Sequence, residues 1–192
     1  MTPVAWRYPA ELETDIEVRT GATLHLRPIR SDDAAKLVAF HGRLSFDSIY
    51  RRYFSVHPEL SHDEVIHLTE VDYVDRLALV IEDGNDLVAV GRYDRYPSST
   101  TAEVAFVVRD DCQHLGLGHR LLQALADAAR VRGITTLTAE TLFENHDMMS
   151  VFRHSTFPIT TSISGGEISV RLAIGPSEDH SAALDVPPVE TS

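Results

Sequence analysis

Cysteine, basic side chains and long apolar runs are all scarce in this 192-residue sequence. The one cysteine, Cys112, excludes a disulfide framework within the chain and favours a reducing compartment. No apolar run approaches the roughly 20 residues that a membrane-spanning helix needs, and residues 1–10 lack the pattern of a signal peptide. We therefore expect a soluble, cytoplasmic protein.

The charge balance is strongly acidic. Lys and Arg number 17 against 29 Asp and Glu, which gives a net charge of −12 with His neutral. This charge repels the phosphates of nucleic acids and anionic membranes, so neither is an expected partner. Because 43% of the residues are hydrophobic, the chain can bury a core. We predict an N-terminal arm in residues 1–22, one folded domain in residues 23–175 and a disordered acidic tail in residues 176–192.

Apolar periodicity and turn residues predict a mixed α/β (α+β) architecture. Helices are expected after the N-cap signals at Ser31 and Ser61, and over residues 47–54, 118–132 and 145–155. Strands are expected over residues 16–19, 23–28, 77–82, 87–93, 102–108, 134–142, 159–164 and 167–174. This order favours a mixed, mostly antiparallel sheet flanked by helices, and it does not fit a doubly wound Rossmann sheet.

The most informative segment is a strand, residues 103–108, followed by a glycine-bearing turn that opens a long helix. The first N–H groups of a helix have no intrahelical partner and lie at the positive end of its dipole, so a pyrophosphate fits there. Gly116 and Gly118 let the main chain approach such a ligand without a Cβ. No Gly-Lys-Ser/Thr follows, which excludes a P-loop, and the glycine spacing differs from the dinucleotide-binding fingerprint.

The motif Gln113-x-x-Gly116-x-Gly118 resembles the acyl-CoA pyrophosphate loop of the GNAT N-acetyltransferase superfamily. The flanking segments resemble one branch of it, the actinobacterial protein lysine acetyltransferases, whose catalytic domains are often fused to acyl-CoA-ligase-like or ligand-sensing domains. The resemblance covers residues 24–174. The segments that carry it are Leu26-Arg27-Pro28-Ile29-Arg30, Arg51-Arg52-Tyr53-Phe54, Ala102-Glu103-Val104-Ala105-Phe106-Val107-Val108, and Glu144-Asn145 with residues 149–152.

The resemblance implies a GNAT fold, splayed at the acyl-CoA site, with acetyl-CoA as co-substrate and no metal. It implies that strand residues 106–108 hydrogen-bond the pantetheine arm through the main chain, and that an N–H of Val108 or a neighbour polarises the thioester carbonyl. The turn would hold the pyrophosphate, and Asn145 would contact the cofactor from the next helix, near Phe152. The implied cofactor-binding residues are Phe106, Val107, Val108, Gln113, His114, Leu115, Gly116, Leu117, Gly118, His119, Arg120, Asn145 and Phe152.

The resemblance also implies a catalytic role for Glu103, as the base that removes a proton from the acceptor amine. Alternation places Glu103 on the same face of its strand as Ala105 and Val107. The alternative interpretation is a solvated carboxylate at a strand end. Many superfamily members carry a tyrosine in the next helix to protonate the departing thiolate, whereas this chain has Phe152. A thiol pKa near 8.5 makes a dedicated acid dispensable.

Other residues receive weaker hypotheses. His41, Arg51, Asp72 and Tyr73 are candidates for the substrate entrance, although packing for Tyr73 and a surface position for Arg51 are the simpler interpretations. His57, His62 and His67 lack the spacing of a metal site. Cys112 lies beside the turn, where a small residue at the strand exit is a simpler interpretation than a reactive thiol.

We therefore expect an acetyl-CoA-dependent N-acetyltransferase that acts on the ε-amine of a protein lysine. By resemblance, one acceptor is the active-site lysine of an acyl-CoA synthetase. Two alternatives remain open at this point. One is acetylation of a small amine or amino acid, and the other is a non-catalytic acyl-CoA-binding module that regulates a partner.

Overall fold

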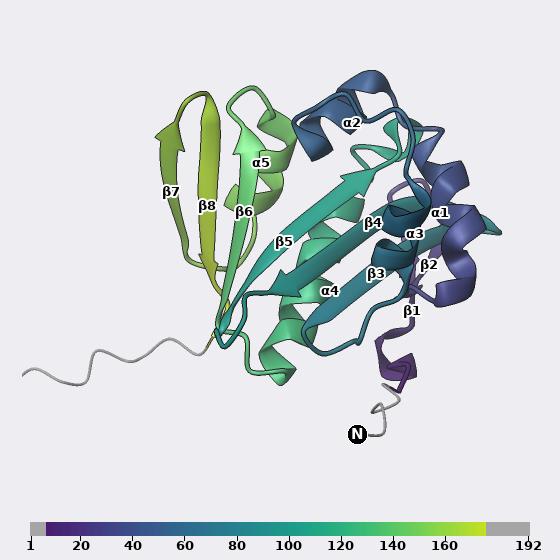
Figure 1. The fold of residues 1–192 in the computed structure, drawn as a ribbon, viewed down its shortest axis with the longest axis horizontal. Helices are drawn as coiled ribbons and strands as arrows, with labels where there is room; N and C mark the ends of the chain where they lie inside the picture. The colour runs from purple at the N-terminus through teal and green to yellow at the C-terminus, as the bar shows by residue number, and fades with distance from the viewer. Residues whose placement is uncertain (1–6, 176–192) are drawn as a thin grey trace, which may run out of the picture.

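The domain is built on one eight-stranded sheet, with strand order β1-β2-β3-β4-β5-β6-β8-β7 (Figure 1). The computed structural model describes residues 7–175, so the predicted tail lies outside the described residues. The strands are β1 (Thr14–Glu17), β2 (Thr23–Pro28), β3 (Arg76–Asp83), β4 (Asp86–Arg95), β5 (Thr101–Val108), β6 (Thr136–Leu142), β7 (Ile159–Ser164) and β8 (Glu167–Ala173). The α-helices are α1 (Ala34–His41), α2 (Phe46–Tyr53), α3 (His62–Thr69), α4 (Leu117–Val131) and α5 (His146–Arg153).

The sheet is antiparallel except where β5 meets β6. These two strands pair in parallel only between residues 101–103 and 136–138. Beyond this short contact they diverge, as Figure 1 shows, while β4 stays paired with β5 through Val108. Within residues 7–175, one edge of β5 is therefore free of strand pairing along its second half. The predicted mixed, mostly antiparallel and splayed sheet is confirmed.

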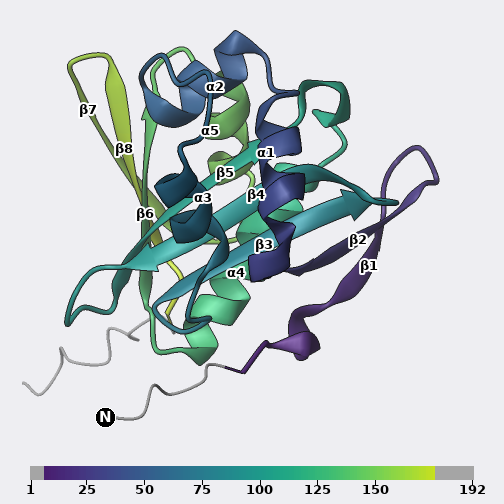
Figure 2. The ribbon, with the colours of Figure 1, turned by 45° about the vertical axis from the view of Figure 1, so that its right-hand side comes forward.

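Helices cover both faces of the sheet. Helix α4 packs on one face, and α1 to α3 lie on the other (Figure 2). The apolar stripe predicted for α4 is buried in the core, including Leu121, Leu122 and Leu125, each at most 1% exposed. Gly91 of β4 allows this close packing, because a Cβ there would lie 3.1 Å from Leu125 Cδ1. A second core cluster forms beneath α1, around Ile29, Leu37, Phe40 and Val80.

The N-terminal segment contributes to the sheet. Residues 14–17 belong to the predicted arm and overlap the strand predicted over residues 16–19. They form the edge strand β1 and pair with β2 in the register Ile16↔Leu24. Both of these side chains are buried. No helix within residues 7–175 is both long enough and apolar enough to cross a membrane.

Candidate active site

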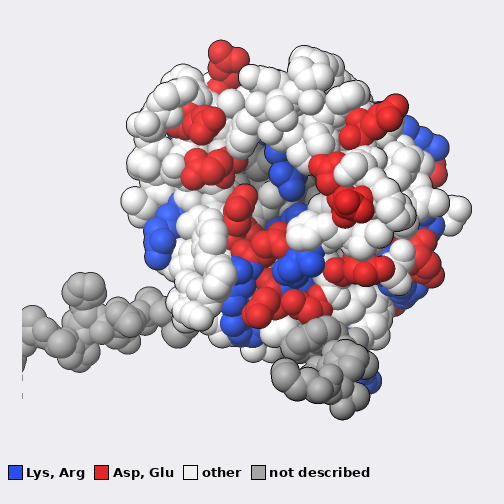
Figure 3. All heavy atoms as spheres, in the orientation of Figure 1, with Lys and Arg blue, Asp and Glu red and all other residues white. Residues whose placement is uncertain are grey.

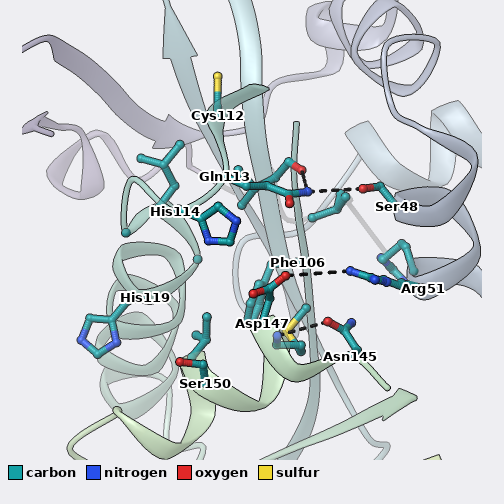
Figure 4. Close-up of a pocket in the computed structure, with 18 of the residues that line it drawn as sticks. Ser48, Arg51, Phe106, Cys112, Gln113, His114, His119, Asn145, Asp147 and Ser150 are labelled. Atoms are coloured by element: carbon teal, nitrogen blue, oxygen red, sulfur yellow. Dashed lines mark hydrogen bonds and ion pairs between the residues drawn. The ribbon is translucent and has the colours of Figure 1, made fainter. Parts of the chain in front are cut away.

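A groove of about 450 Å³ opens where β5 and β6 separate (Figure 4). Its walls come from the end of β5, the turn before α4, and helices α2 and α5. Ten of the residues implied to bind cofactor line it: Phe106, Val107, Val108, Gln113, His114, Gly116, Leu117, Gly118, His119 and Asn145. The groove is thus formed by the segment that the sequence analysis singled out.

The turn before α4 presents a row of free main-chain donors. Gly116 caps the helix in the left-handed region, with φ of 85°, and no side chain caps the helix start. Arg120 N donates to Gly116 O, but the N–H groups of residues 114–119 have no hydrogen-bond partner within the described part of the chain. Free N–H groups at the positive end of a 15-residue helix suit a pyrophosphate.

The free edge of β5 offers main-chain groups to the same groove. Arg109 N donates to Val88 O, so Arg109 is one of the residues whose main-chain groups point toward β4. In an antiparallel ladder only every second residue of a strand bonds to a given neighbouring strand. Phe106 and Val108 therefore direct their main-chain groups away from β4. The carbonyl of Val108 accepts a bond from the Gln113 side chain at 3.3 Å. The amide groups of an extended ligand can therefore pair with this edge as a further strand would.

The opposite wall of the groove joins α2 to α5. Asn145 is 5% exposed and caps α5, with Oδ1 accepting the Met148 N–H at 3.2 Å. Arg51 of α2 faces Asp147 of α5 across the groove, with Nη1 and Oδ2 3.9 Å apart (Figure 4). Arg51 lines the groove while its side chain is 41% exposed, so its position fits both the substrate-entrance hypothesis and the simpler interpretation of a surface cation.

Three residues implied to bind cofactor lie outside the groove lining: Leu115, Arg120 and Phe152. Phe152 is 1% exposed and packs edge-on against Phe106, with ring centroids 5.8 Å apart. It supports the groove from the core. Arg120 is exposed on the outer side of α4, and Leu115 packs against the main core cluster.

Glu103 lies on the sheet face opposite α4. It is exposed, stands opposite Asp94 in the β4–β5 register and does not line the groove. Ala105 and Val107 share its face, as alternation predicts. Any proton that Glu103 accepts must therefore come from a group that approaches β5 from the side of α1 to α3.

The weaker candidates have structural roles. Asp72 Oδ1 accepts the N–H groups of residues 74–76, and the Tyr73 hydroxyl donates to Ile29 O at 2.9 Å. His41 is buried, with Nε2 2.9 Å from His57 O. Burial raises the pKa of the Cys112 thiol, which disfavours a reactive thiolate. Residues 7–175 contain no cluster of three or more metal-ligating side chains.

Several groove residues were missed by the sequence analysis. Ser48 from α2, together with Asp147, Met148, Ser150, Val151 and His154 around α5, also lines the groove. The Arg51-Arg52-Tyr53-Phe54 segment marked α2 as part of the resemblance. No local pattern, however, indicates that Ser48 lies next to Gln113, 65 positions away in the sequence.

The chain is similar to proteins of known family and structure. It is 31% identical to Acetyltransferase Pat of Mycolicibacterium smegmatis over 179 residues, which are 92% of this chain and 50% of Pat. The crystal structure of the GNAT domain of S. lividans PAT superimposes with a TM-score of 0.82 at 36% identity, covering 87% of this chain and 99% of that domain. A cAMP-binding acyltransferase from Mycobacterium smegmatis gives a TM-score of 0.60 at 28% identity, covering 87% and 49% of the two chains.

The chain thus spans about half the length of Pat and nearly all of the S. lividans domain. A family profile described as "Acetyltransferase (GNAT) family" matches residues 44–157, which run from just after α1 to just after α5 and include the whole groove lining. On this match and on the fold, the chain belongs to the GNAT acetyltransferase family.

Proposed function

We propose that this protein is an acetyl-CoA-dependent N-acetyltransferase whose acceptor is the ε-amine of a protein lysine. The observation that carries the proposal is the continuity of the groove. The free main-chain edge of β5 runs directly into the unpartnered N–H groups of residues 114–119. One extended ligand with amide groups at one end and a pyrophosphate at the other fits both.

The binding roles follow from these positions. Main-chain groups of Phe106 and Val108 bind the pantetheine amides, and the turn from Gln113 to His119 binds the pyrophosphate. His114 and His119 add polar side chains at that end. Bound in this way, acetyl-CoA supplies an activated acetyl group at the end of β5, where an N–H of Val108 or its neighbour polarises the thioester carbonyl.

The protein must also prepare the acceptor amine. A lysine ammonium has a pKa near 10.4, so it has to lose a proton before it is nucleophilic. Glu103 accepts this proton, through water where the amine is not in direct contact, because its carboxylate is exposed on the face from which the acceptor approaches. Phe152 has no proton to donate, so solvent protonates the departing thiolate.

The choice of a protein lysine rests on likeness to Pat and to the S. lividans PAT domain. Among protein acceptors, an acyl-CoA synthetase lysine is the one that the family resemblance suggests. A small amine acceptor and a non-catalytic acyl-CoA-binding role are the competing hypotheses. No separate observation of the groove favours either of them over the protein acceptor.

The test is to incubate the purified chain with isotopically labelled acetyl-CoA and a cell lysate, and to map labelled lysines by mass spectrometry. The Glu103→Gln variant is the matched control. Labelled protein lysines that depend on Glu103 support the proposal. Labelling of small amines alone points to the first competing hypothesis. Tight acetyl-CoA binding without any transfer points to the second.

A further inference from the structure

A second, smaller cavity lies on the sheet face that α1 to α3 cover. It measures about 30 Å³, whereas one water needs roughly 10–15 Å³ by the same measure, so a small group fits. Apolar side chains form most of its walls, and two arginines, Arg52 of α2 and Arg92 of β4, supply positive charge. Arg52 and Val107 line both this cavity and the groove, so the two spaces are neighbours.

Arg92 has an unused hydrogen-bond donor. The residue is 7% exposed, and its Nε donates to Asp94 Oδ2 at 2.9 Å. Its Nη2 is buried and has no partner within residues 7–175. A buried charged donor without an acceptor is costly. Asp94 therefore bonds to Nε of this guanidinium, and Nη2 is available to a ligand.

Arg52 carries a charge without an acidic partner. No carboxylate among the described residues lies within 4.0 Å of it, and its guanidinium carbon lies 5.0 Å from the ring centroid of Tyr53. Burial lowers the pKa of Arg52 and the positive charge of Arg92 adds to this effect, whereas the charges of Tyr53, Glu103 and Asp94 oppose it. Two guanidinium groups that repel each other beside one cavity would both be stabilised by an anion.

The register places Arg92 of this pair next to the proposed base. On the face opposite α4, the cross-strand pairs of β4 and β5 run in the order Val90–Val107, Arg92–Ala105 and Asp94–Glu103. Arg92 thus stands one row from Glu103, opposite the small side chain of Ala105. Figure 3 shows basic side chains within a central hollow of this face, with acidic side chains around it.

We propose that Arg52 and Arg92 form a subsite for a carboxylate carried by one of the two reactants. Guanidinium groups bind carboxylates through paired, charge-assisted hydrogen bonds, which suits the free Nη2 of Arg92. The carboxylate belongs either to the acyl group, as in succinyl-CoA, or to an acidic residue beside the acceptor lysine. This inference rests on the proposed function, because it takes the groove as the acyl-CoA site.

The first experiment tests the acyl group. Calorimetry without any acceptor compares the dissociation constants of succinyl-CoA and acetyl-CoA for the wild type, Arg52→Gln, Arg52→Lys and Arg92→Gln. If the carboxylate belongs to the acyl group, the wild type binds succinyl-CoA at least about tenfold more tightly, and both glutamine variants lose this preference. Arg52→Lys should retain part of it. Arg43→Gln is the control, because Arg43 is an exposed cation paired with Asp86 outside both cavities.

The second experiment tests the acceptor. Acetyl transfer is measured to two peptides that differ only in Glu or Gln beside a single lysine. If the subsite binds the acceptor, the wild type shows a KM about tenfold lower for the Glu peptide than for the Gln peptide. The Arg52→Gln variant then shows no such difference in KM. Arg52 forms no ion pair with the part of the chain that the structure describes, so its variants are expected to fold.

The outcomes separate the two proposals. A preference for the carboxylate-bearing reactant, succinyl-CoA or the Glu peptide, that depends on Arg52 supports the subsite. The experiment in which it is seen identifies the reactant that carries the carboxylate. Normal acetyl-CoA binding and transfer without a preference in either experiment would overturn the subsite alone. If neither acyl-CoA binds at all, both the subsite and the proposed function are wrong.

Discussion

The side-chain amide of Gln113 donates to the main-chain carbonyl of Val108 at 3.3 Å and to the Ser48 hydroxyl at 3.4 Å. This glutamine therefore joins three parts of the groove: the turn before α4, the end of β5 and helix α2. In the sequence it is the first residue of the loop motif, whose turn by resemblance holds the pyrophosphate. Its side chain positions the elements that supply the main-chain donors.

We expect Gln113→Ala to destabilise the protein and to weaken acetyl-CoA binding together. Two neutral hydrogen bonds at about 1 kcal/mol each correspond to a fall in Tm of roughly 4–8 °C for a domain of this size. Differential scanning calorimetry and a binding titration measure the two effects. Gln123→Ala is the control, because among residues 7–175 the Gln123 side chain bonds only to Asp127, on α4 itself. Equal losses of Tm and of acetyl-CoA affinity in Gln113→Ala and Gln123→Ala would contradict this role of Gln113.

Glu103→Gln should lower turnover by about 10²–10⁴-fold, because the amide retains the size of the side chain but cannot accept a proton. The affinity for acetyl-CoA should hardly change, since Glu103 lies outside the groove lining. Steady-state kinetics and calorimetry separate the two quantities. Glu140→Gln is the matched control, an exposed carboxylate on β6 that accepts a bond from Ser169. Near-normal turnover in Glu103→Gln would exclude Glu103 as the base.

Gly116→Val should destabilise the turn, because a β-branched residue at a φ of 85° is strained by at least about 1–2 kcal/mol. A Cβ at this position would meet no protein atom within 4 Å, so the strain comes from the backbone conformation alone. Gly116→Asn should largely preserve Tm, since Asn tolerates the left-handed region. Thermal melts of the two variants provide the test. Equal stability of the Val and Asn variants would show that the turn does not require this conformation.

Glu82 should make the fold sensitive to acid. Burial acts to raise its pKa, but hydrogen bonds from Arg27 and Lys36 dominate and lower it to about 2, from 4.5 in the unfolded chain. The ionised Glu82 carboxylate therefore contributes about 3 kcal/mol to the free energy of unfolding. This contribution is complete above the pKa that Glu82 has in the unfolded chain, and it is lost as the pH falls from about 4.5 to 2.

Urea unfolding at pH 7 and pH 3 measures this dependence. Glu82→Gln should unfold more easily at pH 7 and should lose part of the difference between the two pH values. Asp86→Asn is the control, because Asp86 is an exposed carboxylate whose pair with Arg43 contributes little. A Glu82→Gln variant with an unchanged acid dependence would show that other carboxylates cause it.

The sequence was sufficient for features that depend on near neighbours in the chain. Ser61 and Glu64 predict the capping box at the start of α3, and the Ser61 N–H donates to Glu64 Oε2 at 2.8 Å. The sequence also predicted the glycine turn at Gly116 and the apolar stripe of α4. Such features follow from local hydrogen bonding, allowed φ values and helical periodicity, all of which act within a few residues.

Only the tertiary structure decided which distant residues share a site. It placed Ser48 against Gln113, put Phe152 in the core below the groove, and brought Arg52 of α2 beside Arg92 of β4. Each arrangement depends on how α2 and α5 pack around the point where β5 and β6 part. That packing is set by the shapes of side chains far apart in the sequence, for which a single sequence carries no periodic signal.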